Sequence, residues 1–152
     1  METSLPIKRD KVQVVVIFCL KNTYELLLLQ TNEKRGSFWQ NVTGGVEEYD
    51  ADIISAAKRE LKEELNLNAS EVINLDLQFS IHDQWNTQVT ESSFLAIISD
   101  SLKKKISLDP NEHQNYKIIN ATKVTKSDYK YSSNYEAFEK SMDNLKGKGL
   151  IR

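Results

Sequence analysis

The segment from Arg59 to Glu64 carries three glutamates, Glu60, Glu63 and Glu64. On a helix, at about 100° per residue, their carboxylates project on one arc. Like charges at this spacing repel each other by roughly a few tenths of a kcal/mol per pair, and a divalent cation would relieve that repulsion. Mg²⁺ prefers oxygen ligands and is usually held by one or two carboxylates together with substrate phosphates. The arc therefore indicates a site for Mg²⁺, or for Mn²⁺ as a substitute, at which the phosphates of a substrate would bind.

The element that must position these glutamates is a helix predicted over Asp52 to Asn66, which is dense in Ala, Leu, Glu, Lys and Arg. Asp52 or Asp50 is expected near its N-cap, and Asn66 can adopt the left-handed conformation that ends a helix. An apolar stripe would pack against the core: Ile54, Ala57, Leu61 and Leu65. The plainer alternative is that the charged arc is only the solvated face of this amphipathic helix.

A strand and a glycine turn are predicted upstream of the helix. The segment Ser37 to Thr43 alternates aromatic or branched residues with polar ones, as a strand does. Gly44 and Gly45 follow; glycines permit positive φ and close approach of the backbone to another group. The order strand, turn, acidic loop and helix places this turn beside the glutamates.

The rest of the chain predicts a mixed sheet with helices on its faces, an α/β (α+β) fold. Lys103 to Lys105 is expected to be a solvated break. The remaining predicted elements are strands over Val12–Leu20, Glu25–Gln30, 71–83, 87–98 and Tyr116–Ile119, and a closing helix over Asn134–Leu145.

Composition narrows the class of ligand. The chain has 152 residues, the size of one domain, so we expect residues 1–152 to form a single unit. Its 20 Lys and Arg nearly balance its 22 Asp and Glu, which favours a small molecule over a nucleic acid polymer or a membrane surface. The lone Cys19 lies in an apolar run and fits a reducing cytoplasm. The chain is expected to be a monomer or a homodimer.

The glycine turn and the helix together resemble the Nudix box, GX5EX7REUXEEXGU with U aliphatic. Gly45 matches the opening glycine, and the second half is matched by Arg59, Glu60, Leu61, Glu63, Glu64 and Leu67. The chain departs from the pattern at Ala51, where the family has its first glutamate, and at Asn66, which replaces the last glycine. Asp50, with one extra residue in the loop, can stand in for the missing acid.

Beyond the box, the chain is most similar to bacterial dihydroneopterin triphosphate pyrophosphatases. The segments that carry this resemblance are Phe38 to Gly44, Glu91 to Phe94, Glu112-His113 and Ser133-Asn134. The resemblance implies a Nudix-type αβα sandwich with a mixed β-sheet between helices. A basic residue of that group is replaced by Thr31 in this chain.

The resemblance also implies roles for individual residues. Metal ligands are expected at Glu60, Glu64 and Glu112, with Glu63 as a ligand or base and Arg59 orienting a carboxylate. Substrate contacts are expected at Lys8, Thr43, Gly44, Gly45 and Ser133. Each has a structural alternative: Thr43 would only pair a strand, Ser133 would only cap a helix, and Glu112 would be surface charge. Neither His82 nor His113 makes a zinc pattern with the lone cysteine.

The function that these residues predict is Mg²⁺-dependent hydrolysis of a diphosphate linkage in a nucleoside-triphosphate-like substrate. A metal held by the glutamates would neutralise phosphate charge while water attacks phosphorus. Dihydroneopterin triphosphate, cut to the monophosphate and pyrophosphate, is the leading substrate. One alternative is a broader pyrophosphatase of nucleoside triphosphates or dinucleoside polyphosphates. Another is a non-catalytic nucleotide-binding regulatory module, suggested by the irregular loop from Tyr49 to Asp52.

Overall fold

The strands form one mixed sheet in the computed structural model, which describes residues 5–82 and 85–147. The central order is β3-β2-β1-β6-β5, and β4 pairs with β1 while β7 pairs with β2. The pair β1 and β6 is parallel and the other pairs are antiparallel. The strands are β1 (Ile7–Cys19), β2 (Tyr24–Thr31), β3 (Trp39–Gln40), β4 (Val42–Gly45), β5 (Glu71–His82), β6 (Thr87–Ser99) and β7 (His113–Asn120).

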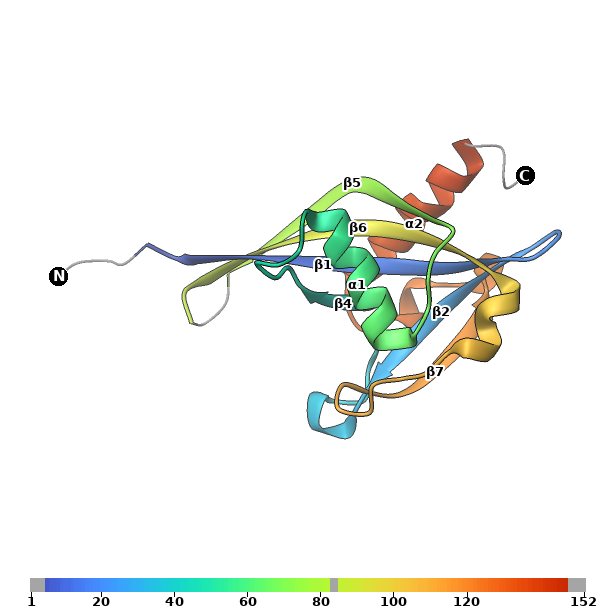
Figure 1. Cartoon of the computed structure of the whole chain (residues 1–152), viewed down its shortest axis with the longest axis horizontal. Helices are drawn as coiled ribbons and strands as arrows, with labels where there is room; N and C mark the ends of the chain where they lie inside the picture. The colour runs from blue at the N-terminus through green and yellow to red at the C-terminus, as the bar shows by residue number, and fades with distance from the viewer. Residues whose placement is uncertain (1–4, 83–84, 148–152) are drawn as a thin grey trace.

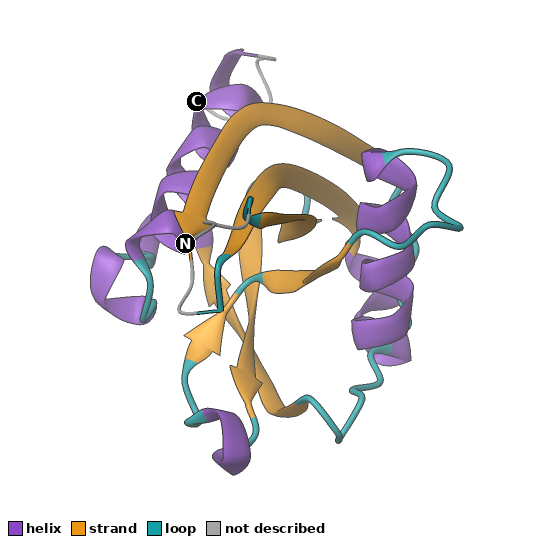
Figure 2. Ribbon diagram, turned by 90° about the vertical axis from the view of Figure 1, so that its left-hand side faces the viewer, coloured by secondary structure: helices purple, strands orange, loops and turns teal. Residues whose placement is uncertain are grey.

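Two α-helices cover the sheet on opposite sides (Figures 1 and 2). They are α1 (Ile53–Leu65) and α2 (Ser132–Gly147). The connections contain the short 3-10 helices η1 (Glu33–Arg35), η2 (Asp100–Lys105), η3 (Ala121–Lys123) and η4 (Lys126–Asp128). This arrangement confirms the predicted αβα sandwich. In the described part of the chain, no helix is long and apolar enough to cross a membrane.

The long strand β1 explains how one apolar run serves two layers. Val12, Val14 and Phe18 pack in the core cluster that holds α1, and Val15 and Ile17 pack in the cluster that holds α2. Successive side chains of a strand point to opposite faces, so a strand covered on both sides is apolar at nearly every position. Cys19 at its end is free and half-buried.

Both ends of α1 are fixed by the residues that the sequence suggested. The side chain of Asp52 accepts a hydrogen bond from the Ser55 backbone N–H at 2.8 Å, so Asp52, not Asp50, is the N-cap. Asn66 has φ 58° and donates its backbone N–H to the carbonyl of Lys62. These two caps set the position of every side chain on the helix between them.

The first of three expectations about the connecting segments is wrong. The strand predicted over Ser37–Thr43 is two strands, because β3 pairs with β2 while β4 pairs with β1. Lys103 to Lys105 form the last turn of η2, where Lys103 makes an ion pair with Glu25. The strand predicted over 71–83 ends at His82, and residue 83 lies outside the described residues.

Candidate functional site

Gly44 makes room for a glutamate of α1. Along β4, Val42 lies in the core cluster of α1, so Gly44, two residues on, faces the same helix. A Cβ atom built on Gly44 would overlap the carboxylate carbon and both oxygens of Glu60. The predicted close approach is therefore confirmed at Gly44. The positive φ that glycine permits does not occur at this turn, because among the described glycines Gly36 has positive φ and Gly44 and Gly45 do not.

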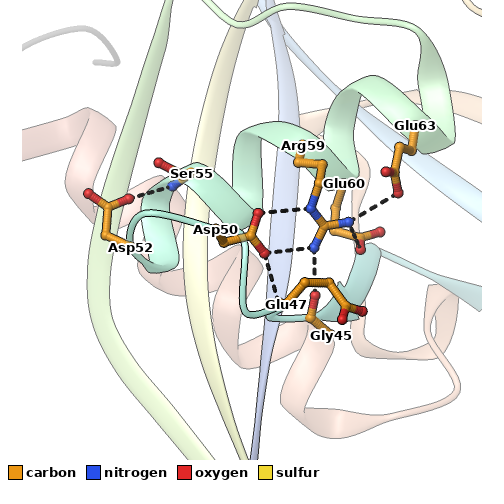
Figure 3. Close-up of polar contacts among 8 residues, drawn as sticks. All are labelled: Gly45, Glu47, Asp50, Asp52, Ser55, Arg59, Glu60 and Glu63. Atoms are coloured by element: carbon orange, nitrogen blue, oxygen red, sulfur yellow. Dashed lines mark hydrogen bonds and ion pairs between the residues drawn. The ribbon is translucent and has the colours of Figure 1, made fainter.

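The Arg59 guanidinium connects the acidic loop to the helix (Figure 3). Arg59 donates from Nε and Nη2 to the two carboxylate oxygens of Asp50, both at 2.9 Å, and from Nη2 to the carbonyl of Gly45 at 2.8 Å. Its Nη1 reaches Glu60 at 2.9 Å and Glu63 at 3.1 Å. Asp50 is thus the acid of this loop that contacts the helix, and Arg59 fixes three carboxylates at once.

Glu64 lies one turn along α1 from Glu60 and faces a carboxylate from a distant loop. One ligand atom from each of Glu64, Glu112 and His113 lies within 4.8 Å of the others. Glu64 is 2 % exposed and His113 is 1 % exposed, and the His113 Nδ1 is 2.8 Å from Glu64 Oε2. The fold therefore brings Glu112 to the glutamates of the helix, as the resemblance implied.

The electrostatics of these carboxylates favour binding of a positive charge. A hydrogen bond with Glu64, together with burial, raises the pKa of Glu112 to about 7. Burial is the main cause that raises the pKa of Glu60 and of Glu64. Two close carboxyl groups in a buried site cannot both ionise easily, so one retains a proton. A divalent cation could take the place of that proton.

The residues fit a divalent metal ion. The donor groups of Glu60, Glu64 and Glu112 are carboxylate oxygens, the ligands that Mg²⁺ and Mn²⁺ prefer. The bare Cα of Gly44 leaves the space in which the Glu60 carboxylate lies. Glu63 points away from this group to the guanidinium, with its side chain 54 % exposed. Among the described residues, two of the four predicted ligands, Glu64 and Glu112, fall in the cluster with His113. Glu60 and Glu63 both bond to Arg59 Nη1.

A second group of predicted residues lies on the α2 face of the sheet. Thr43, on the opposite face of β4 from Gly44, donates from Oγ1 to Glu91 at 3.4 Å. Gln13 donates to the same carboxylate at 3.1 Å and to the backbone carbonyl of Ser133 at 3.3 Å. Burial raises the pKa of Glu91. Thr43 and Ser133 are thus joined through Gln13, on the other side of the sheet from the carboxylates of α1.

Lys8 and Gly45 line a third place, a cavity of about 1000 Å³ beside the acidic loop. The exposed side chain of Trp85 lines the same cavity. Thr31, which replaces a basic residue, is buried and its Oγ1 accepts the backbone N–H of Phe38. The predicted substrate contacts therefore occupy three places: Gly44 lies beside Glu60, Thr43 and Ser133 lie on the α2 face, and Lys8 and Gly45 line the cavity.

His113, Gln40 and Glu91 were not identified as site residues from the sequence. Gln40 and His113 are separated by 73 residues, and their side-chain nitrogens lie 3.0 Å apart. Only the pairing of β2 with both β3 and β7 brings them together. The adjacency of Glu112 and His113 was the one local signal that this segment belongs to the site.

Comparison with known proteins agrees with this geometry. Residues 10–140 match the model of the NUDIX domain, so the chain belongs to the Nudix domain family. This membership confirms the expectation of a Nudix pyrophosphohydrolase at the level of the enzyme class. No curated protein matches the sequence closely enough to count as a relative.

Several solved structures share the fold. A Caenorhabditis elegans Ap4A hydrolase is 23% identical with a TM-score of 0.71, covering 91% of this chain and 98% of that one. A Listeria monocytogenes protein described as a Nudix hydrolase is 23% identical with a TM-score of 0.75, covering 93% and 97%. The Nudix domain of Shewanella oneidensis NrtR, solved with ADP ribose, is 15% identical with a TM-score of 0.70, covering 95% and 90%.

Proposed function

We propose that the chain hydrolyses a diphosphate linkage in a nucleoside-triphosphate-like substrate with a divalent metal, Mg²⁺ or Mn²⁺, held by Glu60, Glu64 and Glu112. The observation that carries this proposal is the meeting of the buried Glu64 with the half-buried Glu112, where the hydrogen bond with Glu64 and partial burial raise the pKa of Glu112 to about 7. Two close carboxyl groups in a partly buried site cost free energy unless a proton or a cation offsets their repulsion. The pair is therefore better explained as a cation site than as surface charge.

The residues of this chain have distinct tasks in that reaction. When bound, a divalent ion supplies positive charge beside the phosphates and lowers the pKa of water. Arg59 keeps the Glu60 carboxylate over Gly44 and ties α1 to the loop through Asp50. Glu63 is 54 % exposed and is the proposed base, accepting a proton from water through the carboxylate oxygen that does not bond to Arg59. We assign Arg59, Glu63 and Glu64 as the catalytic group on this basis.

Substrate contacts are proposed at Lys8, Thr43, Gly44, Gly45 and Ser133. Lys8 and Gly45 line the cavity beside the acidic loop, where a lysine suits phosphate. Thr43 lies beside the half-buried Glu91 and the buried Gln13, polar groups of the kind that select a heterocycle. Among the described strands, β4 pairs with β1 alone, so its second edge is unpaired. A substrate that extends across this second edge of β4 would contact residues on both faces of the strand.

Dihydroneopterin triphosphate is the first substrate proposed, cut to the monophosphate and pyrophosphate. Its support is the resemblance of Phe38 to Gly44, Glu112-His113 and Ser133-Asn134 to bacterial pyrophosphatases of that compound. The second candidate is a broader nucleotide or dinucleoside polyphosphate pyrophosphatase. That candidate is favoured by the likeness in fold to an Ap4A hydrolase. We also propose that residues 1–152 act as one domain in the cytoplasm.

The test is the identification of all products by ion-exchange chromatography, pyrophosphate and phosphate from the triphosphates and mononucleotides or nucleoside polyphosphates from Ap4A and ADP-ribose, with Mg²⁺, with Mn²⁺ and with chelator. The panel contains dihydroneopterin triphosphate, GTP, ATP, Ap4A and ADP-ribose, for wild type, Glu64→Gln and Glu139→Gln. Glu139 is an exposed glutamate of α2 and serves as the matched control. We expect turnover that chelator and Glu64→Gln abolish and Glu139→Gln leaves intact. A preference for another compound of the panel would replace dihydroneopterin triphosphate as the proposed substrate. Metal-independent turnover, or no turnover at all, would reject the proposal of a metal-dependent hydrolase.

A further inference from the structure

His113 bridges an amide and a carboxylate inside the protein. It is the first residue of β7 and pairs with Thr31 of β2. Its Nε2 is 3.0 Å from the Gln40 side-chain nitrogen, and its Nδ1 is 2.8 Å from Glu64 Oε2. All three side chains are buried: Gln40 is 7 % exposed, Glu64 2 % and His113 1 %. Water therefore cannot substitute for either contact.

Counting protons at these two contacts fixes the form of the imidazole. The nitrogen of a glutamine amide only donates, so the His113 Nε2 must accept a hydrogen bond from Gln40. A neutral imidazole has one N–H and one lone pair, and the N–H is then on Nδ1. That N–H donates to Glu64. The reversed Gln40 amide would need a proton on Nε2 and would set the Nδ1 lone pair against an oxygen of Glu64.

We propose that His113 is a positioning residue for Glu64, held in its Nδ1–H form by Gln40, and that it is not itself a metal ligand. Both ring nitrogens are engaged, so His113 has no lone pair for a cation, although it lies in the group with Glu64 and Glu112. The bond occupies Oε2 of Glu64 and fixes the orientation of the carboxylate. The metal is then held by oxygen atoms alone, a set that suits Mg²⁺ or Mn²⁺ better than Zn²⁺.

This role rests on the metal site proposed above, and it differs from that of a histidine that only fills the core. Hydrogen-bond partners of metal ligands typically change metal affinity or activity by about 10- to 100-fold when they are removed. A core histidine would change the free energy of unfolding but not the metal affinity of the folded protein. Asparagine offers a test of rescue, because its amide nitrogen can take the place of Nδ1 and donate to Glu64.

The first measurement is ¹⁵N NMR of the imidazole rings in the metal-free wild type. We expect His113 to show a protonated Nδ1 and an unprotonated Nε2. A protonated Nε2 with a bare Nδ1 would overturn the proposal. This measurement needs no substrate and no variant.

The second measurement is the dissociation constant of Mn²⁺, followed by electron paramagnetic resonance. We expect His113→Leu to weaken Mn²⁺ binding by about 10- to 100-fold, and His113→Asn to recover most of it. His82→Leu is the matched control, because His82 is exposed and bonds to Asn86 in the β5–β6 connection. Wild-type affinity in a folded His113→Leu would overturn the role of His113 alone. Failure of the wild type to bind Mn²⁺ would reject the metal site of the proposed function itself.

Discussion

Arg59 and Asp50 form a two-point ion pair in which Nε and Nη2 of the guanidinium each donate at 2.9 Å to one carboxylate oxygen. The Arg59 side chain is 17 % exposed and that of Asp50 is 4 % exposed. Planar, two-point contacts between arginine and carboxylate are among the stronger side-chain interactions. The pair compensates for the extra residue in the loop, because it restores the link between loop and helix that Ala51 cannot make.

We predict that Asp50→Asn lowers stability at neutral pH and that the loss shrinks as the pH falls. The hydrogen bonds from Arg59 lower the pKa of Asp50 below the ordinary value of an aspartate. A carboxyl group with a depressed pKa in the folded state stabilises the protein above its unfolded pKa, and the contribution disappears as the pH falls through the folded pKa. Urea denaturation of both proteins at pH 7 and near pH 3 measures the difference.

The same substitution is expected to lower kcat by about 10- to 100-fold, since Asp50 holds the arginine that orients Glu60. Asp52→Asn is the control, because asparagine caps a helix about as well as aspartate does. Equal activity losses in Asp50→Asn and Asp52→Asn would mean that the loop, and not the ion pair, matters. A stability difference that stays constant with pH would contradict the ionic role of Asp50.

Gly44→Ala should lose metal binding while Gly45→Ala keeps it. A methyl group at Gly44 would overlap the Glu60 carboxylate, whereas at Gly45 the nearest atom beyond the neighbouring residues, Glu47 Oε1, would be 3.9 Å away. Displacing Glu60 removes one proposed ligand, so we expect Mn²⁺ affinity to fall by about 10-fold or more. Titration of Mn²⁺ into both variants, beside their thermal unfolding, makes the comparison. Matching affinities would show that Glu60 is not a ligand.

The parts of the fold that could be predicted from sequence are those with local signals. Asp52 and Asn66 mark the two ends of α1, and the spacing of Ala57, Leu61 and Leu65 marks its buried side. Capping residues and apolar spacing both depend on residues that are close in sequence, so the bounds and the buried side of α1 could be predicted. The division of Ser37–Thr43 into β3 and β4 depends on two different partner strands, and no local pattern reports it.

The candidate site also contains contacts between residues far apart in the sequence, which no local pattern reports. The expected metal group included Glu63, but Glu63 bonds to Arg59 and lies outside the described cluster of Glu64, Glu112 and His113. His113 joins the site because a β-bulge near Thr31 adjusts the register between β2 and β7. The contacts from Gln40 and Glu64 to His113 span 73 and 49 residues, so they exist only once the sheet is assembled.

Thr43→Val tests whether the α2 face takes part in binding substrate. Valine keeps the branched shape that suits β4 but removes the hydroxyl that donates to Glu91. If Thr43 contacts substrate, KM should rise by about 5- to 10-fold with kcat nearly unchanged, the loss expected for one neutral hydrogen bond. Steady-state kinetics with the preferred substrate of the panel measures both constants.

The structural alternative for Thr43 makes the opposite prediction. A threonine that only pairs a strand would change the free energy of unfolding and leave KM at its wild-type value. Thr23→Val is the control, since Thr23 is exposed in the connection from β1 to β2. Ser133→Ala extends the test to the start of α2, where the Ser133 backbone carbonyl, and not its side chain, accepts from Gln13. Because that bond survives in the alanine variant, a rise in KM there would report contact between the serine hydroxyl and substrate.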